Sequence, residues 1–116
     1  MPLIQVYFKD TKATREVLKS NGLKICEVVA EILHYELSEI VLIPRPMSEG
    51  NLEISVNTLP IDFVIDVGQR AIGQVKLLTP KLVHRFRTEC GLSKIHFGVW
   101  LRPFRDSMFA ENDPTK

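Results

Sequence analysis

The chain has 116 residues, of which 45% are hydrophobic and 25% charged, and its formal net charge is +1. This length and composition fit one globular domain, and the balanced charge argues against nucleic-acid or membrane partners. The uncharged apolar runs are far too short to span a bilayer. The first residues lack the basic and apolar regions of a signal peptide, so we expect a cytoplasmic protein.

The chain begins with a predicted strand and a long helix. Residues 3–8 are apolar and β-prone. After a short polar connection, either Thr11 or Thr14 can cap the helix. We expect one continuous helix through Gly22, because the apolar stripe stays in phase on both sides of this glycine. The stripe consists of Val17, Leu18, Ile25, Val28, Val29, Ile32 and Leu33.

Two further strands are predicted after this helix. Residues 39–43 read as a buried strand, and we expect Pro44 and Pro46 to end its regular pairing because proline cannot donate to a strand ladder. A turn at residues 48–51 precedes an alternating apolar and polar segment, residues 52–57, which predicts a short, half-exposed extra strand.

The second half predicts a strand at residues 63–67, closed by Gly68, and a helix over residues 70–89. Pro80 lies inside this helix, where it predicts a kink; two short helices, the second capped by Thr79, are the alternative. The apolar stripe consists of Ile72, Val75, Leu78, Leu82, Val83 and Phe86.

The rest of the sequence predicts a last strand and a polar tail. Gly91 is expected to end the helix in a left-handed conformation. Residues 95–101 form the strand and Pro103 stops it. Cys26 and Cys90 are far apart, form no CxxC pair and lie in segments predicted as helical. We therefore expect two buried thiols and no disulfide.

Each half of the chain is a strand, a polar turn, a helix and a second strand. Strands joined through a helix pair in parallel with a right-handed crossover. The order therefore predicts an α+β fold: duplicated β-α-β units forming a four-stranded mixed sheet with two helices on one face, plus a short extra strand. We place the domain at residues 1–104 and a polar tail at 105–116. The other sheet face is left open, which predicts oligomerisation.

The candidate binding residues lie in the second half. Arg70 opens a predicted helix, where the helix dipole and bidentate geometry favour a carboxylate; a solvated first-turn arginine is the alternative. Trp100 and Arg102 share one face of the last strand and can line a pocket and hold a carboxylate beside it, unless Trp100 packs in the core or an interface. The basic segment with Lys81 reads as a solvated face, and we expect no metal site.

Four features together carry a resemblance to a known family: the Met-Pro start, the duplicated β-α-β pattern, the Val67-Gly68-Gln69-Arg70 turn and the Leu101-Arg102-Pro103 strand end. The chain resembles the tautomerase superfamily, which includes macrophage migration inhibitory factor and 5-carboxymethyl-2-hydroxymuconate isomerase. The resemblance implies a homotrimer and proton transfer without a cofactor.

The resemblance also implies roles for particular residues. Pro2, once Met1 is removed, is a secondary amine that acts as the base in this family; with Met1 retained it is an amide with no basicity. Lys12 corresponds to an anion-binding arginine, and His96 to a tyrosine that lies beside the neighbouring subunit's proline. Tyr35 lies near the position of the pocket lysine of macrophage migration inhibitory factor, so the chain departs from the family there.

Two functional hypotheses follow. The first is an isomerase or tautomerase acting on a small carboxylated enol or dienol, with Pro2 as base and Arg70, with Arg102 or Lys12, holding the carboxylate. The second is a non-catalytic oligomeric binding or scaffold protein that keeps the fold. Retention of Met1 and the departure at Tyr35 favour the second hypothesis.

Overall fold

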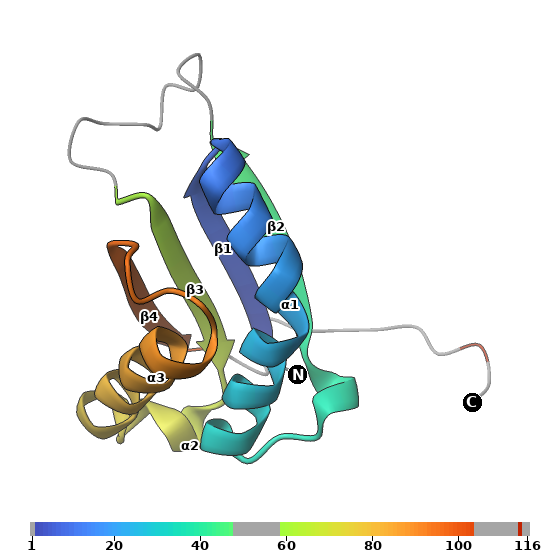
Figure 1. Ribbon diagram of the computed structural model, residues 1–116. Helices are drawn as coiled ribbons and strands as arrows, with labels where there is room; N and C mark the ends of the chain where they lie inside the picture. Colours follow the sequence, from blue (N-terminus) through green and yellow to red (C-terminus); the bar gives the residue numbers. More distant parts are fainter. Residues whose placement is uncertain (1, 48–58, 104–113, 115–116) are drawn as a thin grey trace.

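The computed structural model describes residues 2–47, 59–103 and 114 (Figure 1). The described elements are β1 (Leu3–Lys9), α1 (Lys12–Leu33), a 3-10 turn (Leu37–Glu39), β2 (Val41–Met47), β3 (Ile61–Val67), α2 (Gln69–Ile72), α3 (Val75–Glu89) and β4 (Phe97–Pro103). The turn predicted at residues 48–51, the extra strand at 52–57 and the tail, apart from Pro114, lie outside the described residues.

The four strands form one mixed sheet in the order β2-β1-β3-β4. The outer pairs, β1 with β2 and β3 with β4, are parallel, and the central pair β1 and β3 is antiparallel. Helix α1 connects the first parallel pair, and α2 with α3 connects the second. Helices α1 and α3 cover the same face of the sheet, and the short α2 lies at its end (Figure 1), which confirms the predicted duplicated β-α-β architecture.

Helix α1 begins and continues as the sequence predicts. Thr11 is the N-cap: its hydroxyl accepts a hydrogen bond from the Thr14 backbone N–H at 3.2 Å, and the Thr14 hydroxyl accepts one from the Thr11 N–H at 3.1 Å. This reciprocal pair satisfies two donors that a helix start otherwise leaves unpaired. Gly22 lies inside the helix without breaking it.

Strand β2 corrects one prediction, because Pro44 and Pro46 lie within the paired strand. The Val41 N–H donates to the Pro2 carbonyl oxygen at 3.3 Å, and the Met47 carbonyl oxygen accepts from Asp10 N–H at 3.1 Å. Odd-numbered residues of β2 therefore bond to β1, and the two prolines present their nitrogens to the free edge. No ladder bond is lost there, which is why an edge strand tolerates them.

The second helical segment corrects another prediction, because the break lies at Gly73 and Gln74 and not at Pro80. Helix α2 spans four residues and α3 spans fifteen, with Pro80 inside α3. The Thr79 hydroxyl donates to the Val75 carbonyl oxygen at 2.8 Å and caps no helix. Gly91 has φ of 69°, the left-handed conformation expected after the end of the helix.

The core lies between the sheet and the helices. Alternate residues of β1 and β3 are fully or almost fully buried against the apolar stripes of α1 and α3. Phe63 packs on Phe86 with ring centroids 4.8 Å apart, and Phe97 meets Phe63 edge-on at 6.0 Å. Cys90 is buried within this core and Cys26 is only half-buried; both are free thiols.

The opposite sheet face is covered by no helix or strand among the residues that the structure describes (Figure 1). The register places Leu3, Val41, Val64 and Trp100 on this face. Val41 is 41% exposed and Trp100 is 63% exposed. The open, partly apolar face that the sequence predicts is therefore present in the described chain.

Candidate active site

Pro2 lies at the start of a central strand and is buried. Since β1 and β3 are antiparallel, the start of β1 lies beside the end of β3, where Val67 leads into Gly68. The Pro2 carbonyl oxygen accepts the hydrogen bond from Val41, which fixes the residue at the edge of the ladder. Pro2 is thus held at one defined end of the sheet.

Tyr35 and Arg70 come together at this same end. Tyr35 follows α1, and its hydroxyl oxygen accepts a hydrogen bond from the Gly68 backbone N–H at 3.3 Å. Arg70 is the second residue of α2 and is exposed. Both line a cavity of about 330 Å³ between the end of α1, α2 and the start of α3, here called the helix-end cavity. Pro2 is not among its lining residues.

The helix that holds Arg70 differs from the prediction. Arg70 was expected to open a long helix, but α2 has only four residues and ends before Gly73. A single turn has little macrodipole, so the dipole argument for anion binding at Arg70 does not hold. The remaining argument for anion binding is that Arg70 places a guanidinium on the wall of the helix-end cavity.

Arg102 is held by a partner that sequence reasoning missed. Its Nε donates to Asp66 Oδ1 at 2.6 Å and its Nη2 to Asp66 Oδ2 at 3.2 Å, a bidentate ion pair. The hydrogen bond that Arg102 donates to Asp66 is the main reason that the pKa of Arg102 is raised. Because Asp66 already fills the guanidinium fork, Arg102 in this chain does not offer a vacant carboxylate site.

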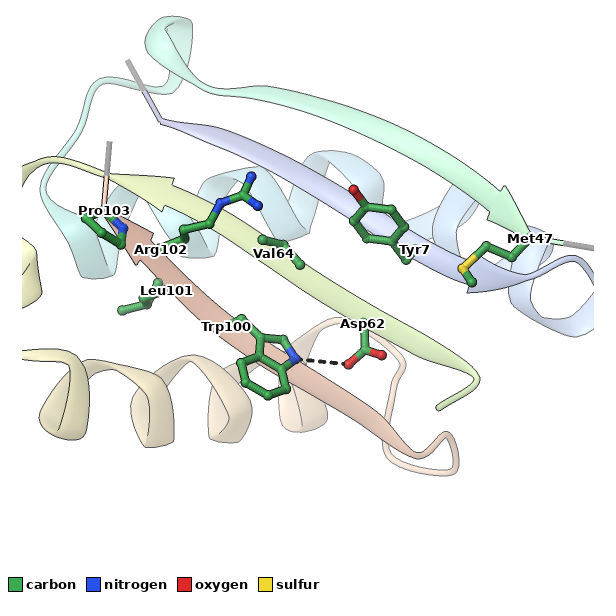
Figure 2. A pocket seen from close by; sticks show the side chains of 8 residues that line it. All are labelled: Tyr7, Met47, Asp62, Val64, Trp100, Leu101, Arg102 and Pro103. Carbon is green, nitrogen blue, oxygen red and sulfur yellow. Dashed lines mark hydrogen bonds between the residues drawn. The ribbon is translucent and has the colours of Figure 1, made fainter. Parts of the chain in front are cut away.

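Trp100 and Arg102 do share one face of β4, as the even spacing predicts. With Tyr7, Asp62 and Val64 they line a hollow of about 500 Å³ on the open sheet face (Figure 2). The Trp100 indole Nε1 donates to Asp62 Oδ1 at 3.3 Å, drawn as the dashed line in Figure 2. Trp100 therefore lines a pocket and is not part of the core.

The acidic partners Asp62 and Asp66 have a signal in the sequence. They alternate with Phe63, Ile65 and Val67 in an otherwise apolar strand, so they mark the face of β3 that turns away from the core. Pairing them with β4 required the strand register, which aligns Asp62 with Gly98 and Asp66 with Arg102.

Lys12 and His96 lie at the other end of the sheet. Lys12 is the first residue of α1, its side chain is 87% exposed, and its Nζ lies 4.0 Å from Glu16 Oε1. His96 is exposed and directly precedes β4, which begins beside the start of β3. Within one chain, neither residue approaches the end that holds Pro2, Tyr35 and Arg70.

Within residues 2–47 and 59–103, no group of three or more His, Cys, Asp or Glu side chains is arranged to hold a metal ion. No helix in the described part of the chain is both long and apolar enough to cross a membrane.

No protein-family model and no curated protein matches the sequence. Solved structures do. Malonate semialdehyde decarboxylase aligns with a TM-score of 0.58 at 14% identity, covering 97% of this chain and 92% of the other. A macrophage migration inhibitory factor-like protein from Entamoeba histolytica gives 0.53 at 13% identity, covering 96% and 93%. A fused 4-OT symmetric trimer gives 0.55 at 16% identity, covering 90% and 87%. This chain has the tautomerase-superfamily fold.

Proposed function

We propose that this protein is a cofactor-independent isomerase or tautomerase that moves a proton on a small carboxylated enol or dienol, with the amine of Pro2 as the base. The observation that carries the proposal is the buried position of Pro2 at the start of a central strand in this fold. Removal of Met1 turns the Pro2 nitrogen into a secondary amine. Burial disfavours a protonated amine, and a pKa near the working pH suits a general base.

In the proposed reaction the amine takes the proton of the enol hydroxyl and the resulting ammonium gives a proton to the carbon of the double bond, which yields the keto tautomer and restores the free amine. Arg70 holds the substrate carboxylate, because it lies at the same end of the sheet as Pro2 and forms no ion pair within the described chain. Lys12 lies at the other end and Arg102 is paired with Asp66, which leaves Arg70 as the favoured candidate.

The proposal includes self-association into a homotrimer, which would have two consequences. It would cover the open sheet face with its exposed Trp100. It would also let His96 of one subunit approach Pro2 of the next, which a single chain does not allow. One neighbour of the same fold is a symmetric trimer.

The proposal is tested by intact mass spectrometry of the untagged protein together with ketonisation of enolic phenylpyruvate. We expect a mass without Met1 and a measurable rate that falls about 10²–10⁴-fold in Pro2→Ala, the usual worth of a general base. A Pro2→Ala variant as active as the parent protein would exclude the proposed base. Circular dichroism of both proteins separates lost chemistry from lost folding.

The alternative is a non-catalytic oligomeric binding protein. Two points favour it: the resemblance puts Tyr35 near the position of a pocket lysine, and in the structure Asp66 occupies the fork of Arg102. This alternative predicts a retained Met1, or a Met1-free protein whose phenylpyruvate rate does not depend on Pro2.

A further inference from the structure

The helix-end cavity has an unusual set of polar side chains. His34 and Tyr35 come from the end of α1, Arg70 and Gln74 from α2 and the turn after it, and Lys81 from α3. No aspartate or glutamate of the described residues lines the cavity. Three separate elements therefore place two permanent cations, an imidazole, an amide and a phenol around one space of about 330 Å³.

The two cations are not neutralised within the described chain. Arg15, Arg85 and Arg102 each form an ion pair with a described carboxylate, whereas Arg70 and Lys81 form none with any described residue. A concave, partly apolar wall strengthens the field of charges that line it. The charge of this cavity is thus complementary to an anion.

His34 adds a second, independent observation. It is the only described non-glycine residue with positive φ, at φ 59° and ψ 49°, in the left-handed region. Glycine is the usual residue there because a Cβ makes this conformation costly. This conformation turns the chain at the end of α1 and brings the His34 side chain to the wall of the cavity.

The cavity lies at the C-terminal end of α1, where the helix dipole by itself disfavours an anion, so anion binding there depends on the cationic side chains. The N–H groups of His34 and Tyr35 both donate to the Ala30 carbonyl oxygen, the latter at 2.9 Å, so this carbonyl is satisfied. The Tyr35 hydroxyl oxygen accepts from Gly68 N–H, which leaves its own proton for donation.

We propose that the helix-end cavity binds a small doubly charged anion, a phosphate group or a pair of carboxylates, through Arg70, Lys81 and His34. Arginine suits such groups because its fork donates two parallel hydrogen bonds, and lysine adds a second charge. The inference shares Arg70 with the proposed function and extends that residue's site to a substrate, or part of one, with two negative charges. It does not depend on proton transfer at Pro2, which lies outside the cavity lining.

Isothermal titration of the full chain with inorganic phosphate, succinate and acetate tests the proposal. We expect saturable binding of phosphate or succinate at millimolar concentration and at least about tenfold weaker binding of acetate, which carries one charge. Tighter phosphate binding assigns the site to a phosphate group, and tighter succinate binding assigns it to a dicarboxylate. Equal affinity for all three probes, or binding that does not saturate, would overturn the proposal of a site for a doubly charged anion.

Three variants localise the binding. Arg70→Gln and Lys81→Gln each weaken it about tenfold, as expected for loss of one charge-assisted contact. Lys76→Gln, an exposed lysine on the same helix outside the cavity, leaves it unchanged. An equal loss in the Lys76 variant would show a non-specific charge effect and refute the site.

His34→Gly distinguishes a binding role from a structural one. Because glycine accepts the left-handed conformation, this variant keeps or raises the melting temperature while it weakens binding of the preferred probe. A lower melting temperature with unchanged affinity would refute the role of His34. Pro2→Ala keeps the anion affinity, so failure of proton transfer at Pro2 and failure of this site are separate outcomes.

Discussion

Gly91→Ala is expected to destabilise the fold, because the end of α3 depends on a glycine there. The left-handed φ of 69° costs an alanine about 1–2 kcal/mol. An added Cβ would also lie 2.9 Å from Asn21 Nδ2, which donates to the Val17 carbonyl oxygen at 3.0 Å. Displacing Asn21 adds about 1 kcal/mol for the disturbed hydrogen bond.

The sum, about 2–3 kcal/mol, corresponds to a melting temperature lower by about 8–12 °C at roughly 4 °C per kcal/mol for a domain of this size. Differential scanning calorimetry measures it. Gly22→Ala is the matched control: it lies inside α1 with nothing within 4 Å of a new Cβ, so it should stabilise by about 0.5–1 kcal/mol. Equal melting temperatures for the two variants would refute this account of the helix ends.

Three further predictions concern charge and burial. Arg102→Ala should cost about 1–2 kcal/mol in urea unfolding because it leaves the mostly buried Asp66 unpaired; an unchanged midpoint would contradict the ion pair. The hydrogen bond from Arg85 lowers the pKa of Glu89 to about 2, so the stability that this pair adds is present above the ordinary glutamate pKa and is lost as pH falls toward 2. In Glu89→Gln the free energy of unfolding should fall less steeply between the ordinary glutamate pKa and pH 2 than in the parent protein. An unchanged pH dependence would exclude a stabilising role for the Arg85–Glu89 pair. Burial raises the pKa of Cys90 to about 11, so a thiol reagent at pH 8 should modify Cys90 more slowly than it modifies cysteine in a small peptide; an equal rate would contradict its burial.

The fold was predictable because local and global signals agree in most elements. The capping threonine, the in-phase stripe through Gly22 and the strand alternation each indicate the structure that forms. The two errors share one cause. A proline does not have the same effect everywhere: Pro44 and Pro46 lie in the outer strand β2 without interrupting its pairing with β1, and Pro80 lies inside α3, whereas the helical break falls at Gly73 and Gln74.

The candidate site was only partly predictable. Strand periodicity predicts that Trp100 and Arg102 share one face of β4. Only the strand register shows that Arg102 is already paired with Asp66. The helix-end cavity joins His34 with Lys81, which are 47 positions apart (81 − 34), so no spacing rule relates them. The basic pattern around Lys81 predicts a solvated helix face, because a sequence does not show which neighbouring element a surface lysine meets.

The claim that Pro2 is a base is tested most directly by comparing one chain in two forms, with Met1 removed and with Met1 retained, each verified by intact mass. The two forms differ by Met1, whose presence turns the Pro2 nitrogen from a basic amine into a non-basic amide; Pro2→Ala in the Met1-free form separates loss of the base from obstruction by Met1. The account predicts that the Met1-free form ketonises enolic phenylpyruvate about 10²-fold or more faster than the Met1-retaining form. Equal rates in the two forms would contradict it.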